Sequence, residues 1–353
     1  MIFSTILIDW YNANKRDLPW RKTENPYEIW VSEIVLQQTR IEQGLPYYHS
    51  FLAQFPNVDA LANASLDEVL KVWQGLGYYS RARNMHAAAK QIQVDYNSVF
   101  PNTFSEILKL KGVGNYTAAA IASFAFKEYK AVVDGNVIRF ISRYLGVFED
   151  VSKKANLNII EKFVSNEILK SQQADIFNQA IMELGALVCT PQNPACSICP
   201  FNKKCIAFAQ NKINDAPFFA KKTKKQVRYF HYVNFIIHKN NTLHALIGQR
   251  EEKDIWLKLF EIPLYEKRNA KKEEILHHFS LSKNESKHLL KKSNIVHQLS
   301  HRELKICFWE YEISFEKLPK NLLNRYSIIP QNEIFSYAMP VPLLRYFEQK
   351  LEK

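Results

Sequence analysis

Four cysteines lie within seventeen residues near the middle of the chain, and their spacing constrains the fold of this segment strongly. They are separated by six, two and five residues and comprise Cys189, Cys196, Cys199 and Cys205. Four thiolates in one short loop can enclose a soft metal centre with little loss of chain entropy. The spacing is similar to that of a [4Fe-4S] ligand set, but zinc stays open, although zinc sites usually contain two short cysteine pairs and this chain has one. Two disulfides are the least favoured alternative, because nothing else suggests export.

The length and charge of the chain suggest two domains and a polyanionic partner. A chain of 353 residues exceeds the size at which one hydrophobic core usually stops growing. It has 47 Lys and Arg residues against 35 Asp and Glu residues, a net charge of +12. This surplus favours nucleic acid or an anionic membrane surface and does not choose between them. The longest nearly apolar stretch, residues 118–126, is too short to span a bilayer.

The N-terminus lacks the pattern of a secretory signal. It has no basic region, and Asp9 interrupts its apolar run, so we expect an amphipathic helix. One further cysteine, Cys307, lies alone in an apparent strand. Clustered cysteines with one isolated, buried thiol are typical of a reducing compartment, and we therefore expect a cytoplasmic protein.

Helical periodicity dominates the chain up to about residue 210. The segment Ser65–Glu68 has the pattern of a capping box, and Thr103–Glu106 marks another helix start. From Asn214 to Arg228 the pattern changes, because Pro217 interrupts it and basic residues follow without acids. We interpret this segment as a solvated interdomain linker, although a linker that follows DNA phosphates would have the same composition.

Strand patterns appear after the linker. Residues 229–238 and 243–249 flank a turn-like segment, as in a hairpin, and residues 304–309 alternate between apolar and other side chains. Helical segments are predicted over 271–279 and 283–292. We therefore expect an all-α domain over 1–213, a linker over 214–228 and an α+β domain over 229–353.

Residues 110–121 predict a helix, a tight hairpin and a second helix. Gly112 and Gly114 can adopt positive φ and let backbone N–H groups approach a phosphate. Helix capping alone also explains a single Gly-x-Gly turn. Asp134 follows twenty residues later at another helix start, where its carboxylate is either functional or a simple N-cap.

Glu33 lies on a largely apolar helical stripe. Desolvation disfavours the charged form of a carboxyl group, so this residue could hold a proton near neutral pH and act as a general acid. The alternative is a glutamate at the edge of the stripe, paired with Lys or Arg.

Residues 74–84 interleave glycines, aromatic residues and arginines. Such a turn can present Leu76 or Tyr78 as a wedge into a base stack while Arg81 contacts phosphate. Burial of Leu76 and Tyr78 beside a structural turn is the alternative.

In this order, the motifs resemble those of the helix-hairpin-helix DNA glycosylases of the endonuclease III superfamily, which carry an iron-sulfur cluster. Within it the chain is most similar to the MutY family of adenine glycosylases. The resemblance covers essentially the whole chain and rests on residues 18–21, 32–39, 74–84, 110–121, 133–136 and 183–189. It implies an all-α glycosylase domain with a [4Fe-4S] loop held by the four cysteines. A MutT/Nudix-like α+β domain would follow.

The resemblance also implies roles for individual residues. Glu33 matches the acid that protonates adenine at N7 and later helps to position or activate water, and Asp134 matches the carboxylate that stabilises the sugar cation. The target base must be flipped out of the duplex to reach them. Tyr116 stands where bifunctional relatives have lysine, which implies a monofunctional enzyme, and Asn136 matches a residue that orients the catalytic groups.

On the opposite strand, the resemblance implies contacts with 8-oxoguanine. Gln38, Leu76 and Tyr78 match residues that fill or wedge the stack, and Ser300 and His301 match a lesion-reading loop.

The chain departs from the family pattern at several positions. Leu299 replaces a common Phe, Lys111 replaces a frequent proline, and residues 254–263 lack the usual glycines. No Nudix metal-binding box is present in the sequence, so nucleotide hydrolysis is not implied.

We therefore expect a monomeric base-excision repair enzyme that removes adenine opposite 8-oxoguanine or guanine and leaves an abasic site. Its partners would be double-stranded DNA and replication or repair proteins, with no membrane. It would associate with the nucleoid in a bacterium. Two alternatives stay open: a pyrimidine-lesion glycosylase with lyase activity, and a non-catalytic DNA-binding iron-sulfur protein that senses redox state.

Overall fold

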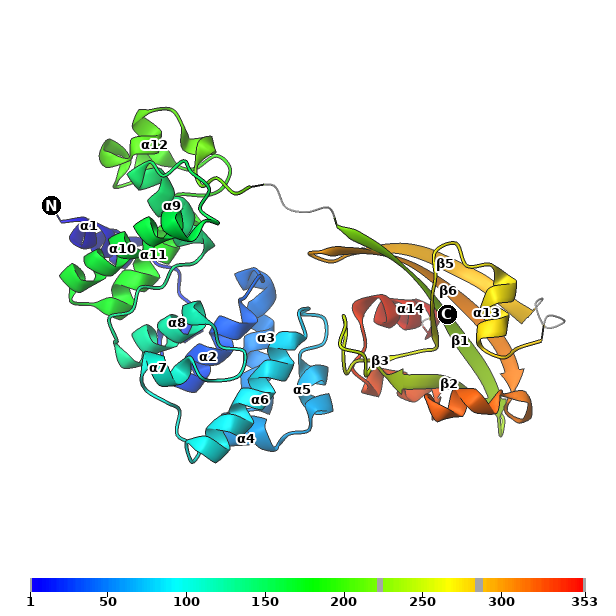
Figure 1. The fold of residues 1–353 in the computed structure, drawn as a ribbon. Coiled ribbons are helices and arrows are strands. Elements are labelled where there is room, and N and C mark those ends of the chain that lie inside the picture. Colours follow the sequence, from blue (N-terminus) through cyan, green and yellow to red (C-terminus); the bar gives the residue numbers. More distant parts are fainter. Residues whose placement is uncertain (1, 221–224, 283–287, 352–353) are drawn as a thin grey trace. The chain divides into compact units, whose positions relative to one another are not determined.

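The computed structural model describes residues 2–220, 225–282 and 288–351. The chain divides into two compact units, shown as a ribbon in Figure 1. The first comprises Met1–Ala64 and Asn84–Lys221, and the second comprises Ser65–Arg83 and Lys222–Lys353. The segment Ser65–Arg83 thus belongs to the second unit, whereas the sequence pattern suggested a single boundary within residues 214–228.

The regular structure of the described N-terminal half is helical, as the periodicity predicts. The helices are α1 (Phe3–Asn14), α2 (Pro26–Val35), α3 (Ile41–Gln54), α4 (Val58–Asn63), α5 (Leu66–Val72), α6 (Ser80–Asp95), α7 (Phe104–Ile107), α8 (Asn115–Phe126), α9 (Gly135–Leu145), α10 (Lys154–Ser171), α11 (Ala174–Leu187) and α12 (Ile206–Ala209). Short 3₁₀ helices lie at Pro19–Arg21, Cys196–Ile198, Asn202–Lys204 and Ile213–Asp215.

Local sequence determines where several of these helices begin. The predicted capping box is confirmed, because Ser65 Oγ accepts from the amide of Glu68 at 3.2 Å and Glu68 Oε2 accepts from the amide of Ser65 at 2.7 Å. Thr103 caps α7 through its hydroxyl. The predicted N-terminal helix is also confirmed, since α1 buries Leu7 and Tyr11.

Two groups of helices form the first unit. Helices α1, α9, α10 and α11 pack around a core that contains Phe140, Val164 and Phe177. Helix α2 packs against α3 and α8. The second half of α2 and the starts of α8 and α9 therefore meet, and the polar residues of the candidate site lie there.

The C-terminal half contains a mixed sheet, as the α+β prediction requires. Its strands are β1 (Gln226–Lys239), β2 (Thr242–Gln249), β3 (Phe260–Glu261), β4 (Leu264–Glu266), β5 (Leu289–Gln298), β6 (Arg302–Ser314) and β7 (Ser327–Pro330). Their order is β3-β2-β1-β6-β5, while β4 pairs with β1 and β7 with β2. Strands β1 and β6 are parallel, and the other pairs are antiparallel.

Both faces of the sheet are covered, which explains the nearly continuous burial along its central strands. Helix α13 (Lys272–His278) packs on the face that includes Val233. Helix α14 (Val341–Leu351) packs on the other face, where Tyr346 stacks on Phe308 with ring centroids 4.4 Å apart. The predicted hairpin is confirmed, because β1 and β2 join through Asn240 and Asn241, which both have positive φ.

The structure corrects one helix prediction and refines one strand prediction. Residues 289–292, predicted to be helical, lie in β5, and residues 283–287 of that prediction lie outside the described residues. Apart from Leu289 the side chains of β5 are largely exposed, so backbone pairing with β6 determines its conformation and apolar periodicity could not reveal it. Strand β1 begins at Gln226, within the expected linker, and Lys221, Lys222 and Lys224 of that segment lie outside the described residues.

Candidate active site

A cavity of about 1020 Å³ opens in the first unit where α2, α8, α9 and α11 contribute side chains. Four predicted catalytic residues line it: Glu33, Tyr116, Asp134 and Asn136. The predicted DNA-contacting residues Gln38 and Gly114 line the same cavity. The sequence-predicted polar groups of this unit therefore converge on one open cavity.

Glu33 projects from the last turns of α2, a helix that starts at the N-cap Asn25 and at Pro26. Its side chain is buried, and it accepts a hydrogen bond from the hydroxyl group of Tyr116 on α8. Burial raises the pKa of Glu33 to about 7, and the nearby charge of Asp134 acts in the same direction. Near neutral pH this carboxyl group is therefore a usable proton donor.

Asp134 is the N-cap of α9, so the structural role considered from sequence is present. One carboxylate oxygen accepts from the amide of Val137 at 2.7 Å, and the other accepts from Nδ2 of Asn136 at 2.7 Å. Burial raises the pKa of Asp134 against the opposing effect of these hydrogen bonds. The cap fixes the carboxylate at the cavity wall, where a developing positive charge would be stabilised.

At position 116 the cavity contains the phenol of a tyrosine and not an amine. Burial, together with the charges of Glu33 and Asp134, raises the pKa of its hydroxyl group well above the usual range. Tyr116 therefore stays protonated and serves as a hydrogen-bond donor to Glu33.

One ionic cluster at this cavity was not predicted. Glu183 of α11 is almost completely buried and accepts bidentate hydrogen bonds from Arg16 at 2.9 and 2.6 Å and from Arg21 at 2.9 and 2.8 Å. Burial opposes its charge, but the two arginines outweigh burial and lower the pKa of Glu183 to about 2. A lone acid inside the apolar run Ile181–Leu187 was the signal that a buried partner must exist.

Arg139 is a second residue that sequence reasoning missed. Its guanidinium group donates to Oδ1 of Asn136 at 2.9 Å, to the carbonyl of Gly185 at 2.7 Å and to the carbonyl of Cys189 at 2.7 Å. It thereby connects the residue that holds Asp134 to the first cysteine of the cluster loop.

The four clustered cysteines line one small cavity, and all of them are free thiols, so the disulfide alternative is wrong. Arg143 braces this loop, donating to Sγ of Cys189 at 3.4 Å and to the carbonyls of Thr190 and Ala216 at 2.7 and 2.9 Å. Four sulfur donors are the ligand set of an iron-sulfur cluster. Among the described residues, no three His, Cys, Asp or Glu side chains are arranged to hold a single metal ion, so the structure gives no support to zinc.

The glycine hairpin is present, but only one of its two glycines has positive φ. Gly112 has φ of 75°, and a Cβ atom there would lie 2.4 Å from Cβ of Asn84. Gly114 has φ of −97° and is the N-cap of α8, so the expectation of positive φ is wrong at this position. Its conformation is extended because a residue at an N-cap adopts β-region angles.

The remaining predicted DNA-contacting residues belong to the second unit. Leu76 is buried, whereas Tyr78 is 42% exposed and has positive φ. Arg81 is buried and donates to the carbonyl of Gly77 at 3.1 Å. Of this trio, Tyr78 alone presents a largely accessible side chain.

Ser300 and His301 are exposed between β5 and β6. The hydroxyl group of Ser300 forms a hydrogen bond with the hydroxyl group of Tyr78 within the second unit. These two predicted lesion-contacting residues are thus brought together.

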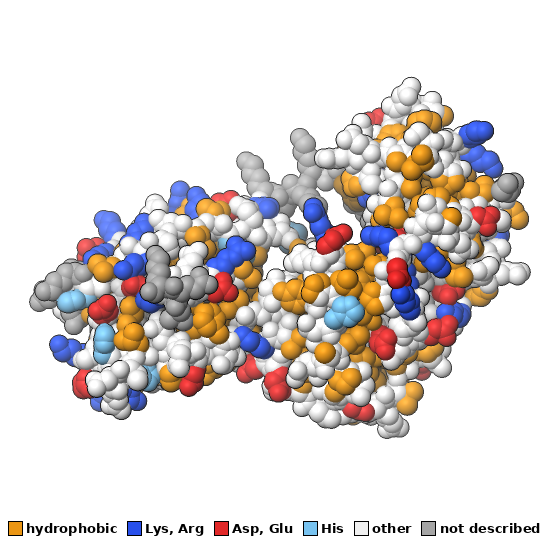
Figure 2. All heavy atoms as spheres, turned by 180° about the vertical axis from the view of Figure 1, so that it is seen from behind, with side chains coloured by type: hydrophobic (Ala, Val, Ile, Leu, Met, Phe, Trp, Pro, Cys, Tyr) orange, Lys and Arg blue, Asp and Glu red, His pale blue; other side chains and the backbone are white. Residues whose placement is uncertain are grey.

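Charges of both signs are mixed on one face of the molecule. On the face shown in Figure 2, Lys and Arg side chains are interspersed with Asp and Glu side chains instead of forming one continuous basic band.

Within the described ranges, no helix combines the length and hydrophobicity that a transmembrane span requires.

Comparisons with known proteins agree with this fold. Residues 31–166 match the HhH-GPD superfamily of base excision DNA repair proteins, and residues 233–349 match the NUDIX domain. The chain also resembles a thermostable thymine-DNA glycosylase, with a TM-score of 0.54 and 29% identity over 59% of this chain and 95% of that one. A helical fold with buried carboxyl groups in one cavity, preceding a Nudix-like domain, defines a DNA glycosylase of the helix-hairpin-helix class.

The relatives specify the family. The adenine DNA glycosylase of Buchnera aphidicola subsp. Baizongia pistaciae is 36% identical over 305 residues, which are 86% of this chain and 82% of that protein. The human adenine DNA glycosylase is 41% identical over 214 residues, 58% of this chain and 39% of that protein. The chain belongs to the adenine DNA glycosylase family. It is a DNA-binding hydrolase of N-glycosyl bonds that excises adenine in base excision repair.

Proposed function

We propose that the chain is a monofunctional, monomeric glycosylase that removes adenine paired with 8-oxoguanine or guanine, with Glu33 as the acid and Asp134 as the stabilising carboxylate. One observation carries this assignment: the two carboxyl groups line the same cavity, and burial raises the pKa of Glu33 to about 7. A base flipped into this cavity would meet a protonated donor and a carboxylate held by hydrogen bonds.

The proposed reaction follows from these two environments. Glu33 transfers its proton to N7 of adenine, and the bond between C1′ and N9 then breaks with its electron pair leaving on the base. The carboxylate of Asp134 stabilises the positive charge on the sugar. Water adds at C1′ and returns a proton to Glu33, which leaves an abasic site. Asn136 and Tyr116 are positioning residues for Asp134 and Glu33, respectively, through the contacts described above.

Tyr116 supports the monofunctional assignment against the lyase alternative. A Schiff base requires an unprotonated amine at the sugar, and this position presents a phenol with a raised pKa. We therefore propose that strand cleavage requires added alkali.

We also propose residues for recognition of the opposite base. Gln38, Leu76 and Tyr78 would fill the stack, and Ser300 and His301 would contact the lesion, 8-oxoguanine. Arg81 and the hairpin glycines Gly112 and Gly114 would lie near the DNA backbone. The exposure of Tyr78, Ser300 and His301 supports this part of the proposal.

Cys189, Cys196, Cys199 and Cys205 are proposed to hold a [4Fe-4S] cluster. The common cavity of the four thiols and the resemblance to the endonuclease III superfamily support it. When bound, the cluster would brace the loop that Arg143 and Arg139 connect to α9.

We further propose a glycosylase domain over 1–213, a linker over 214–228 and a lesion-recognition domain over 229–353. The protein would act in the cytoplasm, at the nucleoid in a bacterium, with replication and repair proteins as further partners.

Single-turnover cleavage of a labelled duplex tests the function. We expect adenine opposite 8-oxoguanine to yield strand breaks only after alkali, and a thymine-glycol duplex to stay intact. Breaks at thymine glycol without alkali would instead support the lyase alternative. Tight binding without any break would support the non-catalytic one.

A further inference from the structure

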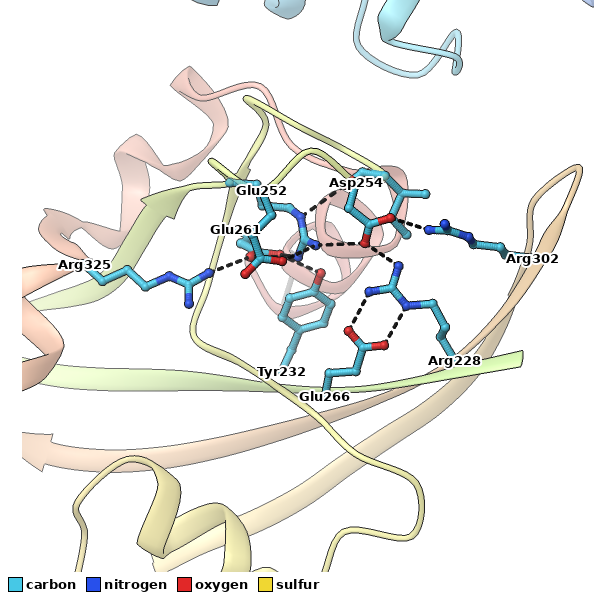
Figure 3. Close-up of polar contacts among 10 residues, drawn as sticks. Arg228, Tyr232, Glu252, Asp254, Glu261, Glu266, Arg302 and Arg325 are labelled. Atoms are coloured by element: carbon cyan, nitrogen blue, oxygen red, sulfur yellow. Dashed lines mark hydrogen bonds and ion pairs between the residues drawn. The ribbon is translucent and has the colours of Figure 1, made fainter. Parts of the chain in front are cut away.

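A charged network in the C-terminal half of the chain centres on Asp254 (Figure 3). Its two carboxylate oxygens accept from two different arginines, Arg228 at the start of β1 and Arg302 at the start of β6. Burial opposes the charge of Asp254, but hydrogen bonds from the two arginines outweigh it and lower its pKa to about 2. Asp254 is therefore ionised throughout the physiological range and bridges segments far apart in sequence.

The carboxylate of Asp254 is held in a well-anchored frame. Arg228 is also bound by both oxygens of Glu266, each at 2.6 Å. The loop that carries Asp254 is fixed by Arg250, which donates to the carbonyl of Ile255 at 3.2 Å and to Glu261 at 3.0 and 2.8 Å. Since Arg250 and Glu261 are buried, this frame does not depend on solvent-exposed pairs.

The turn between β5 and β6 has much weaker support of its own. It is closed by the amide of Leu299, which donates to the carbonyl of Arg302 at 2.8 Å, and the amide of Gln226 donates to the carbonyl of His301 at 3.3 Å. The side chains of Ser300 and His301 are exposed, and so are most of those on β5. Packing therefore restrains this turn little, and side-chain contacts at its base matter more.

Two contacts join the base of this turn to the Asp254 loop. Arg302 binds Asp254, and the ring of His297 lies 5.9 Å from that of Trp256. Arg302 directly follows His301 in the chain. The ion pair with Asp254 thus fixes the side chain next to the exposed pair.

We propose that Asp254, acting through Arg302, is a positioning residue for the turn that carries Ser300 and His301 and thereby determines the preference for 8-oxoguanine over guanine. This inference rests on the proposed lesion-reading role of the turn. Hydrogen bonds can distinguish two similar bases only if the groups that form them are held in place before DNA binds. If the turn were loose, the entropy lost in ordering it would offset the binding free energy gained from these hydrogen bonds. Adenine chemistry in the first unit uses none of these residues.

The test compares three full-length variants. Asp254→Asn removes the charge while keeping the size of the side chain. Glu266→Gln is the matched control, because it removes the other carboxylate that binds Arg228 and leaves the pair between Asp254 and Arg302 in place. Ser300→Ala tests the turn itself.

Hydrogen exchange of a peptide spanning residues 297–303 reports on the turn without DNA. Single-turnover rates at limiting enzyme, with adenine opposite 8-oxoguanine or guanine, report on the preference. We expect Asp254→Asn to speed exchange and to lower the ratio of the two rates about fivefold, whereas Glu266→Gln changes neither. The rate at saturating enzyme on the guanine mispair should stay near that of the parent protein.

The outcomes separate this inference from the function on which it rests. The positioning role is wrong if Asp254→Asn leaves hydrogen exchange of the turn unchanged. It is also wrong if Asp254→Asn speeds exchange but leaves the ratio of the two excision rates unchanged, while Ser300→Ala lowers that ratio. If Ser300→Ala leaves the ratio unchanged, the lesion-reading role of the turn is wrong, and the exchange data still decide whether Asp254 holds the turn.

Arg302 could also bind a DNA phosphate directly, which a double-mutant cycle with Arg302→Gln resolves. If the ion pair mediates the effect, the double variant loses no more preference than either single variant. Additive losses would overturn the proposed route through Arg302. The cycle is also informative if Asp254→Asn alone is poorly folded, because Arg302→Gln leaves the pair between Asp254 and Arg228 intact.

Discussion

At the scale of single residues, the environment of Glu33 links its proposed chemistry to a measurable pH dependence. Its carboxyl group is buried beside Tyr116 and near the charge of Asp134. Burial and the charge of Asp134 disfavour the carboxylate and outweigh the hydrogen bond from Tyr116, so a proton stays available at neutral pH. The same surroundings also impose a cost on the folded state at high pH.

The first prediction concerns the rate of adenine excision. Because Glu33 must be protonated to act as the acid and its pKa is about 7, the single-turnover rate should fall about tenfold per pH unit above that value. In Asp134→Asn the residual rate should begin to fall at a lower pH, because the charge of Asp134 raises the pKa of Glu33. A rate that stays constant through pH 7 and well above it would exclude Glu33 as the acid.

The second prediction concerns the stability of the protein. Since the pKa of Glu33 is raised on folding, its ionisation destabilises the folded state as pH rises from its unfolded value of 4.5 through about 7. Above pH 7 the free energy of unfolding of Glu33→Gln should therefore exceed that of the parent protein by up to about 3 kcal/mol, as measured by denaturant unfolding. Near pH 4 the two proteins should be equally stable. Equal stability at both pH values would show that burial does not disfavour the carboxylate.

At single positions, the sequence is informative where a polar group interrupts or ends an apolar pattern. Glu33 and Asp134 could be selected in this way, and both line the cavity. Arg139 and Arg16 could not be selected, because a surface-like arginine acquires its partner only when distant helices meet. Glu183 carried a signal that was not used, namely an acid inside an apolar helix.

At the scale of secondary-structure elements, the helices were predictable and the exposed strand was not. Each helix of the first unit has a buried stripe, so the apolar period shows it. Strand β5 depends on backbone hydrogen bonds to β6, and the pattern of its own side chains does not reveal this pairing. The two glycines of the hairpin also differ in conformation. Gly112 has positive φ, whereas Gly114 is an extended N-cap of a helix.

The third prediction concerns the hairpin before α8. An alanine at Gly112 must adopt left-handed angles and displace Asn84, so Gly112→Ala should destabilise the protein by about 2 to 4 kcal/mol. Gly135→Ala is the control, because no atom lies within 4 Å of its added Cβ and its stability should change by less than about 0.5 kcal/mol. Denaturant unfolding of both variants measures the difference. Similar losses in the two would mean that the hairpin tolerates a side chain.

At the scale of the whole molecule, the cysteine loop supports several distant segments. Arg143 connects α9 to the carbonyl of Thr190, next to the first cysteine of the loop, and to the carbonyl of Ala216, which follows the loop in the chain. Asp134 is the N-cap of the same helix, so α9 and the hydrogen bonds of Arg143 connect this loop to the cavity.

The fourth prediction concerns the proposed cluster. Cys199→Ser should lose the visible absorbance of an iron-sulfur centre together with tight DNA binding, because the loop would no longer be braced. The control is Cys307→Ala, which removes the buried thiol of β6 and should retain both properties. Absorbance spectra and titrations with a labelled duplex provide the measurement. A colourless Cys199→Ser protein with unchanged affinity would contradict the bracing role.

Strand β5 has a consequence for the behaviour of the protein at high concentration. It is the last strand on its side of the described sheet, with exposed Leu290, Ile295 and Val296. An exposed edge strand can pair with a strand of another molecule. Lys291 and Lys292 and the register shift beside them oppose this pairing. Because salt screens the repulsion between lysines, colloidal stability should decrease as ionic strength rises. The same salt that weakens the hold of the enzyme on DNA therefore also favours its self-association.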